Sequence, residues 1–179
     1  MNYWQGERIR LRGIEPEDAE HFFRWNLDSD RARQLDFVWP PQSLAAVRAW
    51  CEEQSRKRLD GDAYHWVITD GHDQPVGSIS THDCDHRNGV FSYGLDVAEE
   101  HRRKGYAAEA VRLVLRYYFE ELRYQKCSVV VHSDNEPSMR LHESLGFTRE
   151  GVIRRSIFAG GQYHDNVWYG ITAEELAAK

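Results

Sequence analysis

A run of cations at the start of a long helical pattern has residue types suited to binding phosphate. An apolar, β-prone stretch ends at Val97, a charged link follows, and the run then reads Arg102-Arg103-Lys104-Gly105-Tyr106-Ala107. A glycine between strand and helix lets successive backbone N–H groups converge on one point, where the positive end of the helix dipole also lies. Three consecutive cations stand out in a chain whose formal net charge is -6. The run therefore predicts a pyrophosphate-binding loop.

A solvated basic helix start after an ordinary crossover loop is the alternative interpretation of this run. Arg103 and Lys104 would then only decorate the surface. Gly105 favours the functional interpretation, because glycine in a helix costs about 1 kcal/mol relative to alanine. Close approach of the backbone to a ligand would explain why glycine stands there.

The elements that would position this loop alternate between strand and helix patterns, with no linker-like stretch or internal repeat. Their order predicts a mixed α/β sheet with one right-handed crossover through the helix after the loop, in a single domain over residues 1–179. The expected strands are 8–12, 64–69, 76–81, 90–97, 126–132, 152–158 and 163–172, and the expected helices are 15–28, 43–59, 107–122 and 136–145.

Composition limits the class of protein. A length of 179 residues suits one domain with a single core, and the acidic balance argues against a general nucleic-acid binder. No apolar run reaches the length of a membrane span, and the first residues lack the order of a signal peptide. We therefore expect a cytoplasmic monomer or homodimer without membrane contact. Three cysteines without a close pair fit reduced thiols: Cys51, Cys84 and Cys127.

The spacing Arg102-x-x-Gly105-x-Ala107 after a strand resembles the acetyl-CoA-binding signature of the GCN5-related N-acetyltransferases (GNAT). The similarity extends from about Phe91 to Thr172, and more weakly over residues 7–85. It is closest to the branch that contains ribosomal-protein N-terminal acetyltransferases and spermidine acetyltransferases. The further matching motifs, in order, are Asn135-x-x-Ser138-x-x-Leu141, Leu145-Gly146-Phe147, Glu150-Gly151 and Gly161-x-Tyr163-x-Asp165.

The resemblance implies a GNAT-like, largely antiparallel mixed sheet of six to seven strands, with splayed central strands and about four helices. It also implies acetyl-CoA as co-substrate and no metal. Pantetheine would lie in the slot beside Leu95, Asp96 and Val97, whose backbone would pair with it like a missing strand. The backbone from Arg103 to Ala107 would hold the pyrophosphate.

The same resemblance gives roles to a short helix that follows the parallel strand. Asn135 would bond a cofactor amide and also cap the helix. Ser138 would hydrogen-bond the departing thiolate. His142, four residues later on the same face, stands where many relatives have a proton-donating tyrosine, so it could act as general acid. The alternative for His142 is a packed, satisfied core side chain.

Two further groups of residues are ambiguous. The run His82-Asp83-Cys84-Asp85-His86 contains metal-ligand types, but it precedes a hairpin-turn signal and is more simply a polar loop at the substrate rim. The general base is not evident from the sequence, and a chain of water molecules would serve equally. Candidates by neighbourhood are Tyr93, Asp96, Glu150 and Asp165.

The chain is thus expected to transfer an acetyl group from acetyl-CoA to a primary amine of a small, polyamine-like or aminated metabolite. Direct attack in a ternary complex needs positioning, a proton acceptor and thiolate stabilisation, but no protein nucleophile. An N-terminal acetyltransferase of a protein or peptide is one alternative. A non-catalytic acyl-CoA-binding regulatory module is another.

Overall fold

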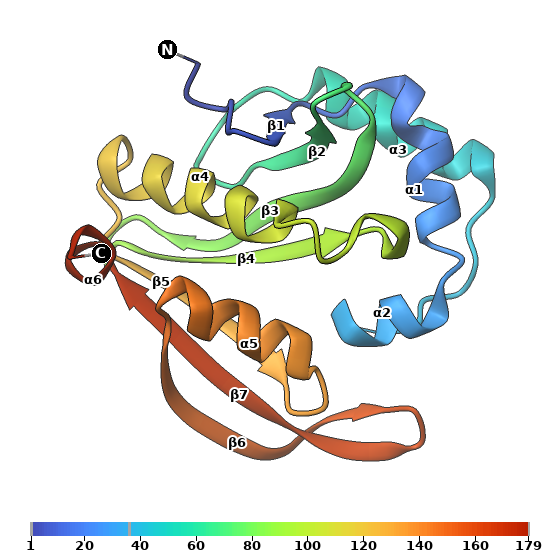
Figure 1. Ribbon diagram of the computed structural model, residues 1–179. Coiled ribbons are helices and arrows are strands. Elements are labelled where there is room, and N and C mark those ends of the chain that lie inside the picture. The colour runs from blue at the N-terminus through green and yellow to red at the C-terminus, as the bar shows by residue number, and fades with distance from the viewer. Residues whose placement is uncertain (1, 36, 179) are drawn as a thin grey trace. The chain divides into compact units, whose positions relative to one another are not determined.

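The computed structural model describes residues 2–35 and 37–178, which contain a seven-stranded sheet and six α-helices (Figure 1). The strand order is β1-β2-β3-β4-β5-β7-β6. The strands are β1 (Ile9–Arg12), β2 (His65–Asp70), β3 (Pro75–Asp85), β4 (Val90–Val97), β5 (Lys126–His132), β6 (Thr148–Ala159) and β7 (Gln162–Thr172). The helices are α1 (Ala19–Trp25), α2 (Ser29–Leu35), α3 (Leu44–Arg56), α4 (Tyr106–Glu120), α5 (Glu136–Leu145) and α6 (Ala173–Ala177), with short 3-10 turns η1 (Pro16–Asp18) and η2 (Glu99–His101).

The predicted fold class is confirmed, and the number of helices is larger than expected. Strands β4 and β5 pair in parallel, at Val90 with Lys126 and at Phe91 with Cys127, and the other pairings with a known register are antiparallel. Helices α2 and α6 were not predicted. Both are short and lack a long apolar stripe, so hydrophobic periodicity does not reveal them.

The chain forms two compact units. The first spans Met1–Ser80 and Gly94–Leu113, and the second spans Thr81–Tyr93 and Val114–Lys179. The single-domain expectation stays a prediction. None of the helices in the described part of the chain is long and apolar enough to cross a membrane.

The core of the first unit forms where α1 and α3 bury their apolar faces. Helix α3 begins at Ser43, whose hydroxyl accepts a hydrogen bond from the Ala46 N–H at 3.1 Å. Removing side chains of this kind from water supplies most of the stability of the unit. The cluster consists of Ile14, Ala19, Phe22, Trp25, Val47, Cys51, Val67 and Ala98.

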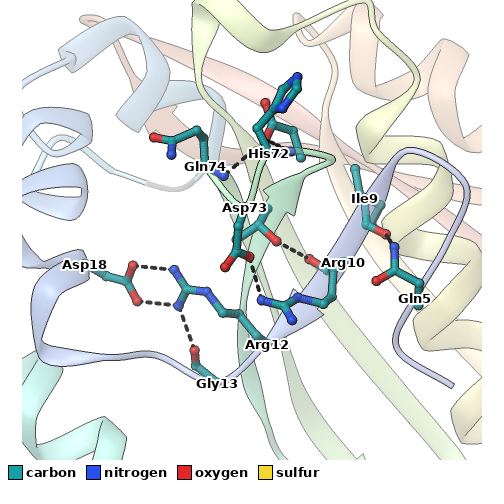
Figure 2. A network of polar contacts seen from close by, with 11 residues as sticks. Gln5, Ile9, Arg10, Arg12, Gly13, Asp18, His72, Asp73 and Gln74 are labelled. Carbon is teal, nitrogen blue, oxygen red and sulfur yellow. Dashed lines mark hydrogen bonds and ion pairs between the residues drawn. The ribbon is translucent and has the colours of Figure 1, made fainter. Parts of the chain in front are cut away.

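Strand β1 carries alternating arginines whose charges are held by carboxylates. Figure 2 shows the Arg10 guanidinium directed at Asp73 and the Arg12 guanidinium in a two-pronged contact with Asp18. The distances are 2.5 Å for the first pair, and 2.7 and 2.8 Å for the second. Paired, planar contacts of this kind fix both groups in one orientation.

A partly buried histidine makes the stability of the first unit depend on pH. The ring of His65 lies 6.1 Å from the ring of Phe22 and 5.6 Å from that of Trp50, and burial lowers its pKa to about 4. Between pH 6.5 and pH 4 the unfolded chain binds a proton that the folded chain excludes. We expect the free energy of unfolding to fall as pH falls through this range, by up to about 3 kcal/mol per molecule.

Urea unfolding of the wild type and of His65→Phe at several pH values between 4 and 8 measures this effect. The variant keeps an aromatic ring between Phe22 and Trp50 but cannot titrate, so its pH dependence should be flatter. His72→Gln changes an exposed histidine and serves as the control. Equal slopes in wild type and His65→Phe would contradict the expectation.

The second unit contains the first half of β4 (residues 90–93), its parallel partner β5 and the long hairpin of β6 and β7. The Phe91 and Tyr118 rings stack at 4.0 Å, and the Tyr118 hydroxyl lies 2.6 Å from the Thr81 hydroxyl. Strand β5 pairs along its whole length with β7, from Lys126 opposite Thr172 to His132 opposite Asn166. Helix α5 (orange) lies alongside this part of the sheet in Figure 1.

The polar run that begins at His82 was predicted as a loop, and this prediction is wrong for most of it. Strand β3 continues to Asp85, although Asp83 has a positive φ of 49°. The Asp85 carboxylate accepts hydrogen bonds from the backbone and side chain of Asn88, and so closes the turn. Pairing within the sheet extended the strand beyond what its polar sequence suggested.

Candidate active site

The cationic loop before α4 contains two left-handed residues directly before the start of a helix. Arg103 and Gly105 both have left-handed backbones, with φ of 61° and 84°. Left-handed residues that alternate with right-handed ones turn neighbouring N–H groups toward a common point. Helix α4 begins at Tyr106, and the first-turn N–H groups of a helix have no intrahelical acceptor. Backbone amides and the helix dipole therefore favour an anion at this place.

The cations of the loop differ in how they are held. The Arg102 Nε donates to the Val97 carbonyl at 3.1 Å and so ties the loop to the end of β4. The Lys104 Nζ lies 3.3 Å from Nδ1 of His101. Among the described residues, no carboxylate forms an ion pair with Arg102, Arg103 or Lys104. Their positive charge is thus available to a ligand.

At the end of β4, the backbone N–H and C=O groups of successive residues point alternately toward β3 and away from it. The Ala98 N–H donates to the Val76 carbonyl at 2.9 Å, and the Asp96 carbonyl lies against Gly77 so closely that a Cβ there would overlap it. Because neighbouring residues of a strand direct their backbone groups to opposite edges, those of Leu95 and Val97 point away from β3. This is the orientation required for the predicted pairing with pantetheine, which itself stays a prediction.

The side chain of Asp96 forms a buried ion pair that the sequence did not reveal. The Arg31 guanidinium of α2 contacts the Asp96 carboxylate, with 8% and 9% of the two side chains exposed. Arg31 also lies over the Trp25 ring at 5.4 Å, and burial lowers its pKa to about 10. It therefore stays charged at neutral pH. The sequence offered a local indication of the helix α2 but not of the ion pair. Asp28 is suited to capping a helix, and its carboxylate accepts from the Arg31 N–H at 3.0 Å at the start of α2.

The short helix α5 begins and ends where its capping residues predicted. The Asn135 side chain accepts from the Ser138 N–H at 3.1 Å, which confirms the cap, and Gly146 ends the helix with φ of 94°. Whether Asn135 also contacts cofactor stays a prediction. Ser138 is partly exposed, one turn before His142.

His142 is a buried, hydrogen-bonded ring with 5% of its surface exposed. Its Nδ1 lies 2.8 Å from the Ser138 carbonyl, which can only accept, so Nδ1 carries the hydrogen. Nε2 lies 2.8 Å from the Tyr93 hydroxyl, which donates to it when the ring is neutral. The ring stacks with those of Tyr93 and Tyr169, each 5.9 Å away.

The surroundings of His142 favour its neutral form. Burial lowers the pKa of His142, and the hydrogen bond to the Ser138 carbonyl only partly opposes this. Burial also raises the pKa of Tyr93 well above its usual value, so the tyrosine stays protonated. A neutral histidine with both nitrogens engaged is suited to holding its neighbours in place. A role of His142 as general acid stays a prediction.

The four candidate bases are engaged in other contacts. Tyr93 and Asp96 are held as described above. The Glu150 carboxylate lies 2.6 Å from the Lys126 Nζ, and the Asp165 carboxylate accepts from the Arg155 N–H at 2.8 Å. In the part of the chain that the structure describes, no group of three or more His, Cys, Asp or Glu side chains is arranged to hold a metal ion.

Comparison with known proteins identifies the family. Residues 8–148 match the family described as an acetyltransferase (GNAT) domain. The uncharacterized SPbeta prophage-derived N-acetyltransferase YokL of Bacillus subtilis (strain 168) is 43% identical over 176 residues, which cover 98% of this chain and 96% of YokL. The putative ribosomal N-acetyltransferase YdaF of the same organism is 29% identical over 94% of this chain and 93% of its own.

A solved structure has the same fold at low sequence identity. The spermidine N-acetyltransferase from Vibrio cholerae, crystallised with CoA and spermine, has a TM-score of 0.83 at 20% identity, over 96% of this chain and 99% of that chain. The chain belongs to the GNAT acetyltransferase family. It is an N-acetyltransferase that uses acetyl-CoA as acyl donor.

Proposed function

We propose that this enzyme acetylates a primary amine of a small molecule, polyamine-like or an aminated metabolite, in a ternary complex with acetyl-CoA. The main support for binding of acetyl-CoA is the loop at Arg103 to Ala107. This loop combines left-handed residues, cations without a carboxylate partner among the described residues, and a helix start. The acidic net charge of -6 favours a cationic acceptor. Similarity to proteins named for spermidine acetylation points the same way.

The loop would hold the pyrophosphate through its backbone N–H groups, with the charges of Arg102, Arg103 and Lys104 around it. The backbone groups of Leu95 and Val97 would pair with the pantetheine amides, and Asn135 would contact one of them. Asp96 would only hold its neighbours Leu95 and Val97 in place, because its carboxylate contacts Arg31 and its carbonyl faces Gly77 of β3. Tyr106 and Ala107 would contribute first-turn amides.

The acceptor amine would attack the acetyl carbonyl directly. The new N–C bond forms, the C–S bond breaks, and the amine proton passes to solvent. A water route fits best, because each candidate carboxylate already has a partner and Tyr93 is buried and protonated. The departing thiolate would accept a hydrogen bond from the Ser138 hydroxyl, with His142 fixing the turn that carries it.

A protein or peptide N-terminus is the second candidate acceptor, since YdaF is named a putative ribosomal N-acetyltransferase. Both acceptors present a primary amine, so the chemistry of transfer is the same. They differ in how much of the acceptor must be recognised beside that amine.

Release of free CoA thiol from acetyl-CoA, with mass spectrometry of the acceptor, tests the proposal. The acceptor panel is spermidine, spermine, other small amines and peptides with free N-termini. We expect acetylation of at least one small amine, at an unchanged rate after treatment with a chelator. Transfer only to peptides would favour the second candidate, and binding of acetyl-CoA without any transfer would overturn the proposal. A rate restored only by added metal would contradict the metal-free mechanism.

A further inference from the structure

The turn before β1 folds back on that strand and presents Arg8 at its tip. The Gly6 N–H donates to the Ile9 carbonyl and the Leu11 N–H to the Trp4 carbonyl, both at 2.9 Å. Gln5 forms an antiparallel bridge with Arg10. The Arg8 side chain is thereby exposed next to a backbone that is fixed on both sides.

This turn lies on the first turn of α4. The Arg8 N–H donates to the Glu109 carboxylate at 3.0 Å, and Gly6 approaches the same carboxylate so closely that a side chain would overlap it. The Arg8 guanidinium donates to the Lys104 carbonyl at 3.3 Å. Its Nη1 lies so close to the position that a Cβ of Gly105 would take that the two would overlap. The turn therefore brings a fourth cation to the phosphate loop from a distant part of the sequence.

The guanidinium of Arg8 differs from those of its neighbours on β1. Arg10 and Arg12 are neutralised by Asp73 and Asp18 (Figure 2). Among the described residues, no carboxylate forms an ion pair with Arg8, and Glu109 accepts from its backbone N–H. Of its five N–H donors, one points to a backbone carbonyl, so the planar fork keeps donors for a ligand.

We infer that Arg8 is a phosphate-binding residue of this enzyme, which contacts a phosphate group of acetyl-CoA bound at the Arg102–Ala107 loop. The inference rests on the proposed role of that loop. Guanidinium groups bind phosphate through two parallel N–H donors and keep their charge at all relevant pH values. Acetyl-CoA offers two targets, the pyrophosphate and the 3′-phosphate of the ribose.

Calorimetric titration of Arg8→Gln and Arg8→Lys with acetyl-CoA and with its 3′-dephospho analogue tests the inference, at low and at high salt. We expect Arg8→Gln to weaken acetyl-CoA binding by about 10-fold at low salt, and Arg8→Lys by less. The loss should shrink at high salt, because an exposed charge contact is screened. Arg10→Gln removes an arginine of the neighbouring strand β1 and should leave affinity unchanged. Thermal melts verify that each variant is folded.

The pattern of losses identifies the phosphate. A loss confined to acetyl-CoA assigns Arg8 to the 3′-phosphate, and an equal, salt-sensitive loss for both ligands assigns it to the pyrophosphate. An equal loss that salt does not change would mean that Arg8 only shapes the loop through the Lys104 carbonyl, and would overturn the inference. Unchanged affinity would overturn it as well. Wild-type protein that binds no acetyl-CoA would reject the proposed loop together with Arg8.

Discussion

Replacing Gly105 by valine is expected to weaken acetyl-CoA binding by about 10²-fold, as for the loss of about two charge-assisted hydrogen bonds. Gly105 has a φ of 84°, which a β-branched residue adopts only with strain, and a Cβ at this position would displace the Arg8 guanidinium. The side chain would also keep the phosphate away from the backbone N–H groups of the loop. Calorimetric titration with acetyl-CoA measures the loss.

The hairpin turn between β6 and β7 offers a matched control for backbone strain. Gly161 has a φ of 83°, but no described atom lies within 4 Å of the position that a Cβ would take there. Gly161→Val should therefore lose similar stability and keep its affinity for acetyl-CoA. Gly105→Asn is the milder variant, because asparagine tolerates a left-handed backbone. A folded Gly105→Val protein with wild-type affinity would contradict the phosphate loop.

Ser138→Ala should lower turnover by about 10²-fold with little change in acetyl-CoA affinity. Removal of one preorganised donor to a developing negative charge typically costs this much or more, although water replaces part of it. Steady-state rates with the acceptor found by screening measure the effect. Ser144→Ala is the control on the same helix, because the Ser144 hydroxyl bonds the Leu141 carbonyl at 2.7 Å and is exposed. Wild-type turnover in Ser138→Ala would exclude the hydroxyl as thiolate partner.

His142→Ala separates a general acid from a positioning residue. As a positioning residue, His142 holds the Ser138 carbonyl and the Tyr93 hydroxyl, and its loss should cost about 2–4 kcal/mol of stability by leaving buried polar groups and a cavity. If His142 is a general acid, His142→Ala should instead lower turnover about 10–10³-fold, and His142→Tyr should retain more activity than His142→Ala. If His142 is a general acid, the turnover of the wild type should fall as pH rises through the pKa of His142, and His142→Ala should lack this fall. A positioning residue predicts no such difference. Thermal melts and pH–rate profiles of both variants decide.

Much of the framework was readable from the sequence because local chemistry dictates it. The bounds of β4, β5 and α5 agree with those predicted. A short apolar run predicted the strand β5, an asparagine caps α5, and a glycine ends that helix in a left-handed conformation. Only one face of β5 is buried, through Cys127, Val129 and Val131, whereas Val130 is 41% exposed, so the expectation of burial on both faces is wrong. The loop before α4 was also evident, since its glycine and three cations are contiguous.

Tertiary structure decided which partners the side chains of Arg31, His142 and Arg8 have. Helix α2 has one buried residue, Arg31, and its ion pair with Asp96 joins α2 to the distant strand β4, beyond any local pattern. Burial lowers the pKa of His142, and the rings that pack against it, Tyr93 and Tyr169, come from strands β4 and β7. Arg8 reaches the loop because the chain folds back at Gly6 against Glu109. Spacing along the chain predicted most of the secondary structure and the cationic loop before α4, whereas the pairing of charges and the shifts of pKa depend on long-range packing.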